Sequence, residues 1–238
     1  MQSDFRGALY GRYVSAFKGS SQAQASHAWW DHKLLPLLAD LDREAAILDV
    51  GCGDGSLMAY LQQRGFAQLV GVDVSPEQVA HARRRGLRVE CADVLTYLAG
   101  CASTLDAVIA VDLLEHLTRD ELVQLAPLIA AALKPNGRFV VQTANGAGLL
   151  PGQVIYGDLT HQTVFTPASL AQLLRQAGFV KLSFYETGPI PLRVRGRLNV
   201  ALWSAIKLIA NTVRYVETGK RQAIWTENFL CLAFLTKR

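Results

Sequence analysis

The chain has 238 residues, of which 50% are hydrophobic and 18% are charged, and its formal net charge is +4. This length allows a substantial buried core, and the hydrophobic content excludes a mostly disordered chain. Residues 1–20 lack a continuous apolar run, so we expect no signal peptide. The four cysteines form no CxxC pair and no metal-ligand spacing, which predicts reduced thiols, no metal site and a cytoplasmic protein.

The N-terminal part is expected to contain one helix. Residues 1–25 are small and polar and predict a flexible lead-in. A helix is predicted from Ser26, and we expect its tryptophans, Trp29 and Trp30, to pack against the core.

The most informative stretch is Ile47–Ser56, in which an apolar run and an acid precede three alternate glycines. This pattern predicts a buried strand, a tight glycine loop and the start of a helix, an arrangement typical of a site for a nucleotide-like ligand. A dinucleotide loop would require glycine or alanine where this chain has Ser56. Asp49 favours instead a ligand that carries an ammonium or sulfonium charge, as S-adenosylmethionine does.

The run from Asp49 to Gly55, Asp-Val-Gly-Cys-Gly-Asp-Gly, resembles the first motif of the class I S-adenosylmethionine-dependent methyltransferases. Later motifs of that family follow in order, so the resemblance extends from about Ala45 to Phe184. It implies a Rossmann-like, doubly wound α/β fold with seven mostly parallel strands, an antiparallel last strand and helices on both faces. It also implies S-adenosyl-L-methionine as cofactor. The cofactor-binding residues expected are Asp49, Gly51, Cys52, Gly53, Gly55, Asp73, Val74, Asp93, Val94, Val111 and Asp112.

Two acids in this set have specific expected roles. Asp73 ends a predicted strand over 69–73, 22 residues after Gly51, where a carboxylate can accept hydrogen bonds from both ribose hydroxyls. Asp93 follows a short predicted strand over 87–90, and the resemblance implies that it accepts a hydrogen bond from the adenine amine. The alternative for both is an ordinary turn or loop aspartate.

A fourth strand is predicted over 105–111, and the resemblance places its end beside the transferring methyl group. Asp112, Glu115 and His116 are therefore candidates for lining the active site. We favour a structural role for Glu115 and His116, because an acid there can cap a turn and a histidine can fill a polar gap in the core.

The connection 143–165 is predicted to be a long structureless stretch that serves as a lid or substrate loop. His161 within it is the candidate general base, because a neutral imidazole can take the proton of an attacking hydroxyl near pH 7. Related methyltransferases carry a similar Thr-His on the acceptor side. The alternative is that His161 only bridges loop backbone.

The remaining elements alternate between helices and strands. We predict helices that begin at Pro76, at the Thr118 capping box and at Pro167, a fifth strand over 138–142 after a turn at 135–137, a sixth strand over 179–186 and a seventh over 228–235.

An amphipathic helix is predicted over about 197–217. From Ile190 onward there are nine lysines and arginines against two glutamates. We expect this helix to pack on its own domain. Peripheral membrane contact through 197–217 and dimerisation are the alternatives, so the chain is expected to be a monomer or homodimer. The excess of positive charge hints at an anionic partner, and an ordinary solvated surface is the alternative.

We therefore expect an N-terminal helical cap over 1–44, a cofactor-binding core over 45–190, and the amphipathic helix with the last strand over 191–238. The expected activity is methyl transfer to a hydroxyl of a small-molecule, sugar or lipid-linked acceptor. The sequence lacks the Asn/Asp-Pro-Pro-Tyr/Phe run that marks methylation of amino groups in bases and glutamine. The alternatives are an RNA-directed methyltransferase, although nucleic acid is the less favoured partner, and a non-catalytic S-adenosylmethionine-binding module.

Overall fold

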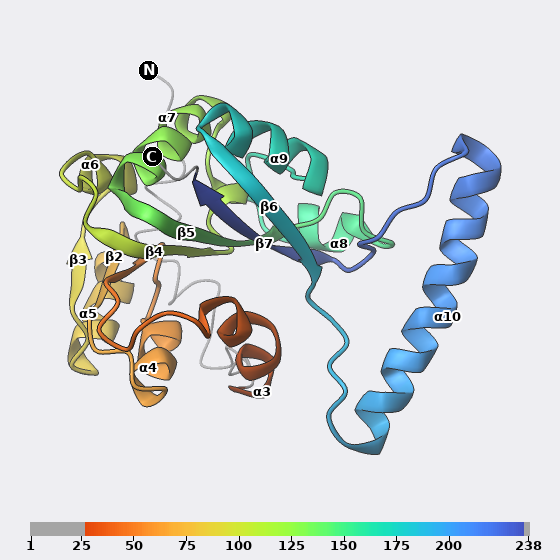
Figure 1. Ribbon diagram of the computed structural model, residues 1–238, viewed down its shortest axis with the longest axis horizontal. Helices are drawn as coiled ribbons and strands as arrows, with labels where there is room; N and C mark the ends of the chain where they lie inside the picture. The colour runs from red at the N-terminus through yellow and green to blue at the C-terminus, as the bar shows by residue number, and fades with distance from the viewer. Residues whose placement is uncertain (1–26, 236–238) are drawn as a thin grey trace.

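The computed structural model describes residues 27–235, so the predicted lead-in over 1–25 lies outside the described residues. A seven-stranded sheet forms the centre, with the strand order β3-β2-β1-β4-β5-β7-β6 (Figure 1). The strands are β1 (Ile47–Val50), β2 (Leu69–Asp73), β3 (Val89–Cys91), β4 (Leu105–Val111), β5 (Leu133–Ala144), β6 (Phe179–Glu186) and β7 (Asn228–Leu235). The sheet is parallel except for β7, which runs antiparallel to both β5 and β6. The predicted fold class is confirmed.

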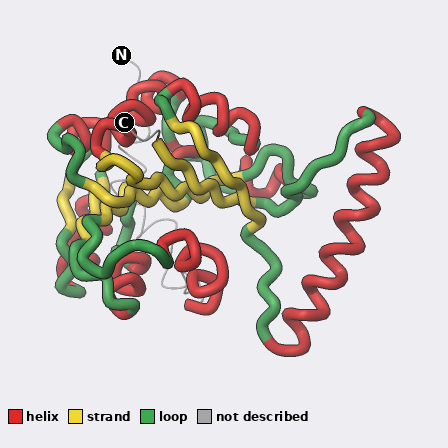
Figure 2. The backbone as a smooth tube through the Cα atoms, viewed as in Figure 1, coloured by secondary structure: helices red, strands yellow, loops and turns green. Residues whose placement is uncertain are grey.

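Helices cover both faces of this sheet (Figure 2). The helical segments before β4 are α3 (His27–Trp29), η1 (Trp30–Leu34), η2 (Leu35–Leu38), α4 (Ser56–Gln63), α5 (Pro76–Arg84) and α6 (Val94–Ala99). Those after β4 are η3 (Leu114–His116), α7 (Arg119–Ala132), α8 (Pro151–Tyr156), α9 (Pro167–Gln176) and α10 (Arg193–Thr218). The segments η1, η2, α4 and α5 share one hydrophobic core with the sheet, and α6, α7 and α9 share the other. Burial on both faces explains the nearly continuous apolar sequences of β1 and β4.

The sheet order creates the place for a ligand. Strand β1 lies between β2 and β4, so the connections leaving β1 and β4 diverge to opposite faces. In open parallel sheets, the crevice outside the carboxyl ends of such strands is where ligands bind. The glycine loop, Asp73 and Asp112 all follow strand ends at this edge.

Two predicted boundaries were wrong. The predicted turn at 135–137 is a bulge within a longer β5, because Leu105 and Ala107 of β4 pair with Leu133 and Arg138, which leaves 134–137 looped out. The connection 143–165 is not structureless: β5 extends to Ala144, which pairs with β7, and α8 begins at Pro151, a residue suited to the first helical turn.

Helix α10 also departs from expectation. It runs along the outside of the molecule, apart from the helices that cover the sheet (Figure 1). None of its 26 residues is buried, so the helix contacts its own domain, on which it was predicted to pack, without burying a side chain there. Trp203, Lys207 and Asn211 form its hydrogen bonds with the body. No helix in the described part of the chain combines the length and apolar character needed to cross a bilayer.

Candidate active site

The glycine loop between β1 and α4 has the backbone conformation that its sequence predicts. Gly51, Gly53 and Gly55 all have positive φ, at 69°, 56° and 74°. A Cβ at Gly55 would lie 2.3 Å from Leu87 Cδ1, so the third glycine lets α4 pack closely against its neighbours. A Cβ at Gly53 would meet nothing nearer than 3.7 Å, and this glycine faces the pocket. The middle glycine therefore leaves room for a ligand close to the backbone.

Asp73 fixes the loop from the neighbouring strand. Its Oδ2 accepts a hydrogen bond from the Gly53 backbone N–H at 2.8 Å, and its Oδ1 accepts one from the Ser75 N–H at 2.8 Å. Ser75 in turn caps α5, where its side chain accepts a hydrogen bond from the Gln78 N–H. The carboxylate thus lies at the pocket edge in one orientation.

A pocket of about 870 Å³ opens at this edge of the sheet. It is lined by ten of the eleven cofactor-binding residues expected from the sequence, and also by His161. Gly55 is the exception, because it packs against Leu87 rather than facing the pocket. Trp30 contributes to the wall while 92% of its surface is covered, so it both packs in the core and shapes the site.

Buried ionisable groups lie at the base of the pocket. Asp49 is 4% exposed, and burial together with the negative charge of Asp73 raises its pKa to about 8. Burial also raises the pKa of the Cys52 thiol, so this residue is a neutral lining group. A carboxyl group in such surroundings favours a cationic partner, since the partner's charge offsets the cost of ionisation.

Asp93 has a local role as well as a place in the pocket wall. Its Oδ1 accepts hydrogen bonds from the backbone N–H groups of Leu95 and Thr96 at 2.9 and 3.1 Å, which makes it the N-cap of α6. The side chain is exposed and lines the pocket. The cap fixes the carboxylate in position, which is what a residue that contacts a ligand needs.

The segment after β4 turns sharply at Asp112, whose φ is 50° and whose Oδ1 accepts a hydrogen bond from Gln142 Nε2 at 2.9 Å. Glu115 is buried, and its Oε2 accepts a hydrogen bond from Thr143 Oγ1 at 2.9 Å. Burial and the nearby Asp112 raise the Glu115 pKa to about 8. Its backbone oxygen also accepts hydrogen bonds from the N–H groups of residues 162 and 163, which attaches the distant connection to η3.

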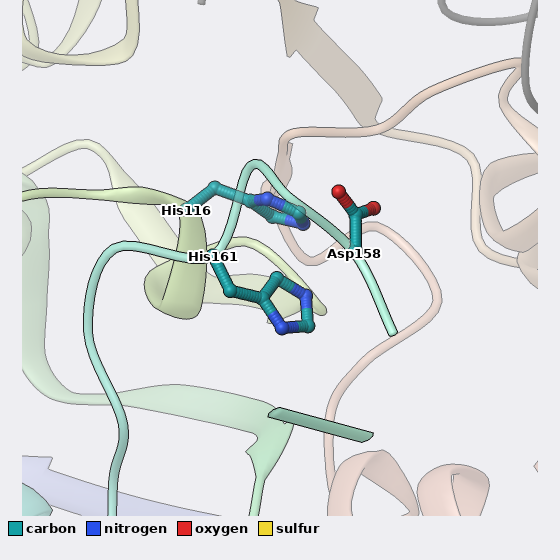
Figure 3. Close-up of side chains that lie close together, drawn as sticks. All are labelled: His116, Asp158 and His161. Carbon is teal, nitrogen blue, oxygen red and sulfur yellow. The ribbon is translucent and has the colours of Figure 1, made fainter. Parts of the chain in front are cut away.

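That attachment brings three side chains together at the pocket wall. His116 comes from η3, while Asp158 and His161 come from the segment after α8, and Figure 3 shows the three facing a common space. The two histidine rings are 4.8 Å apart between centroids, and one ligand atom from each of the three residues lies within 4.8 Å of the others. Two imidazoles and one carboxylate are a donor set that could hold a divalent transition metal.

The hydrogen bonds indicate which histidine nitrogens carry protons. His161 Nδ1 lies 3.2 Å from the Ile155 carbonyl oxygen, which only accepts, so this nitrogen donates. Thr160 Oγ1 donates to Asp158 Oδ1 at 2.6 Å and therefore accepts from His116 Nδ1 at 2.8 Å. In a neutral imidazole that donates through Nδ1, Nε2 carries the lone pair, so His161 Nε2 can accept a hydrogen bond.

Sequence reasoning selected His161 but missed Asp158 and Thr160, and it assigned His116 a structural role. The run Tyr-Gly-Asp-Leu-Thr-His over 156–161 contains the signal, because three polar side chains recur within four residues. This run does not reveal that His161 contacts His116, because His116 lies 45 positions earlier in the sequence and the fold alone brings the two side chains together.

Proteins that resemble this chain are methyltransferases, in agreement with the geometry of the pocket. Residues 21–183 match the family described as a methyltransferase domain. The ubiquinone biosynthesis O-methyltransferase of Xanthomonas axonopodis pv. citri is 30% identical over 214 residues, which cover 74% of this chain and 86% of that protein.

Solved structures show the same fold. A SAM-dependent methyltransferase from Archaeoglobus fulgidus has a TM-score of 0.69 at 19% identity, with 94% of this chain and 99% of that one covered. The 1,6-didemethyltoxoflavin-N1-methyltransferase of Burkholderia thailandensis, solved with bound 1,6-didemethyltoxoflavin and S-adenosylhomocysteine, has a TM-score of 0.61 at 22% identity, with 98% of this chain and 89% of that one covered.

The fold and site define a Rossmann-like enzyme for an adenosine-containing ligand. The features that do so are the doubly wound sheet, the glycine loop after β1 and the acid at the end of β2. With the family match, the ligand is specified: the chain belongs to the class I S-adenosylmethionine-dependent methyltransferases. Its cofactor is S-adenosylmethionine.

Proposed function

We propose that this enzyme transfers the methyl group to a hydroxyl of a small-molecule, sugar or lipid-linked acceptor. Two observations support an oxygen acceptor. The Xanthomonas relative is named an O-methyltransferase. In addition, residues 112–117 read Asp-Leu-Leu-Glu-His-Leu in place of the Pro-Pro motif of base and glutamine N-methylation.

The residues of the pocket fit S-adenosylmethionine. We assign Asp73 to the ribose hydroxyls, Asp93 to the adenine amine and Asp49 to the cationic methionine end. The absence of a Cβ at Gly53 leaves space for a ligand at the loop backbone, and the raised pKa of Asp49 marks a buried carboxyl group that a cation would stabilise in its ionised form. Val74, Val94 and Val111 supply apolar walls between these polar groups. When bound, the cofactor supplies a methyl group already activated by its sulfonium.

His161 is the proposed general base, and the geometry of its ring carries this proposal. Its Nδ1 donates to the Ile155 carbonyl oxygen, so Nε2 is available to accept the proton of an acceptor hydroxyl. The side chain lines the same pocket as the glycine loop. The main contribution of the protein is then to orient the acceptor, with a base positioned to take its proton.

His116 is the proposed positioning residue for the acceptor. The chain of hydrogen bonds from His116 through Thr160 to Asp158 fixes its ring, which faces the same space as the His161 ring (Figure 3). Two imidazole rings that face one space can contact two neighbouring hydroxyls of an acceptor. Acceptors with vicinal hydroxyls, as in catechols and sugars, therefore fit this wall best.

A second mechanism for the same reaction is supported by the convergence of His116, Asp158 and His161. A divalent metal held by these side chains would lower the pKa of a bound hydroxyl and would replace the base. Chelation distinguishes the two mechanisms, because only the metal mechanism loses activity when the metal is removed.

The function is tested by incubating the full chain with methyl-labelled cofactor and matched pairs of acceptors that differ only in carrying a hydroxyl or an amine at one position. We expect label on oxygen, identified by the NMR shift of the new methyl group, and we expect catechol or sugar diols to exceed mono-hydroxyl acceptors. Label found only on nitrogen or on RNA would contradict the proposal.

A further inference from the structure

The inner side of α10 is polar. Lys207 Nζ lies 2.6 Å from Glu186 Oε2 at the end of β6, and Trp203 Nε1 donates to the same carboxylate at 3.4 Å. One turn further along, Asn211 Oδ1 accepts from the Gln222 N–H at 2.7 Å. Positions 203, 207 and 211 recur every four residues, so they define the helix face that contacts the body.

The opposite side of α10 is apolar and exposed to solvent. Val194, Leu202 and Val216 are 83%, 53% and 82% exposed. The large exposed hydrophobic residues of this helix are Val194, Leu198, Leu202, Ile206, Leu208, Ile209, Val213, Tyr215 and Val216. We call this set the outer face of α10. At 100° per residue most of these side chains point away from Lys207, so the helix is amphipathic with its apolar side turned outward.

Exposing such an apolar surface to water is unfavourable in free energy. Soluble monomers rarely expose contiguous apolar patches of more than a few hundred Å², and a helix of 26 residues is about 39 Å long. Larger patches of this kind mark interaction sites.

The charges on the helix indicate which partner fits. Arg193, Arg195 and Arg197 occupy its first turns, Lys207 and Arg214 follow, and Glu217 is its only acid. A second copy of the chain would bring the same excess of positive charge to the interface, which disfavours pairing between two α10 helices. A surface that combines negative headgroups with apolar chains complements both the arginines and the outer face.

We propose that the outer face of α10 binds the surface of an anionic phospholipid bilayer, with the helix lying in the plane of the headgroups. The helix has too few consecutive apolar residues to cross a bilayer, in agreement with the absence of a spanning helix among the described residues. This proposal does not depend on the methyl acceptor. It would place the pocket beside a membrane, where a lipid-linked acceptor would be available.

Flotation with vesicles tests the proposal on the full chain. We expect binding to vesicles that contain phosphatidylglycerol and little binding to pure phosphatidylcholine. Leu202→Glu should lower the partition coefficient at least tenfold, since it loses the burial of a leucine side chain. Neutralising Arg195 and Arg197 to Gln should lower it about fivefold per residue.

Val123→Glu on α7 is the matched control, because Val123 is also 53% exposed but lies on another helix. This variant should bind as the parent does, and cofactor affinity should be unchanged in all variants because α10 does not line the pocket. Sedimentation without lipid should show a monomer. Three results would overturn the proposal: a stable dimer that Leu202→Glu dissociates, equal binding to neutral and anionic vesicles, or no binding at all.

Discussion

The two sides of the pocket are built differently. The cofactor side comes from β1, β2, β3, the end of β4 and the turns that directly follow these strands, so its groups lie within a few residues of a strand end. The acceptor side joins η3 to the segment after α8, and hydrogen bonds from residues 162 and 163 to Glu115 connect the two. Short sequence segments therefore suffice to build the cofactor site, whereas the acceptor side of the pocket depends on tertiary contacts between distant segments.

The largest expected effect concerns the cofactor side. Asp73→Ala should weaken binding of S-adenosylhomocysteine about a thousandfold, because it removes the assigned ribose partner and two charge-assisted hydrogen bonds, one from Gly53 of the loop and one from Ser75 before α5. Calorimetric titration measures the affinity. Asp54→Ala serves as the control, since its carboxylate bonds Ser56 and Arg85 and not the loop glycines, and it should cost less than tenfold. Equal losses in the two variants would refute the ribose assignment.

Folding stability should respond strongly to the third glycine. Gly55→Ala places a methyl group at a φ of 74° and within 2.3 Å of Leu87, so we expect a loss of about 3 kcal/mol in the free energy of unfolding. Gly86→Ala has a similar φ of 77° but meets nothing within 4 Å, and it should cost about 1 kcal/mol. Urea denaturation of both variants measures the difference, and equal costs would show that packing at Gly55 is not tight.

The residues of the cofactor side could be predicted from the sequence because they stand at the ends of consecutive strands. The glycine spacing and the acid before the loop lie within one strand and turn, and Asp73 ends the next strand 22 residues after Gly51, so this pattern could be interpreted without knowing the fold. No sequence pattern indicates that His116 and His161 are neighbours. They come together because residues 162 and 163 form hydrogen bonds with the Glu115 carbonyl oxygen. The amphipathic pattern of α10 predicted a helix but could not show that Lys207 and Glu186 would turn its polar side inward.

Cofactor affinity should depend on pH through Asp49. In the free enzyme its raised pKa of about 8 keeps the carboxyl group protonated at lower pH, where the proposed cationic partner would have to displace the proton. Affinity should therefore rise at least tenfold between pH 6 and 8, and Asp49→Asn should abolish this slope. Because the folded pKa lies above the unfolded one, Asp49 also destabilises the ligand-free fold as pH rises from about 4 to 8. A flat affinity profile in the parent enzyme would exclude Asp49 as the partner of the cation.

The smallest effect is expected from metal removal. If His161 Nε2 takes the proton itself, treatment with EDTA should leave methyl transfer within twofold of the untreated rate. A loss of activity that Mg²⁺, Mn²⁺ or Zn²⁺ restores would instead assign His116, Asp158 and His161 to a metal. Inductively coupled plasma analysis of the dialysed protein provides the control.

The central claim is that binding and proton transfer are separate tasks of the two sides of the pocket. His161→Gln tests it most directly, with His81→Gln as the control, because His81 is exposed on α5 away from the pocket. We expect His161→Gln to lower kcat at least a hundredfold at neutral pH and to leave the Kd for S-adenosylhomocysteine within twofold. Retained kcat, or a loss confined to cofactor affinity, would contradict it.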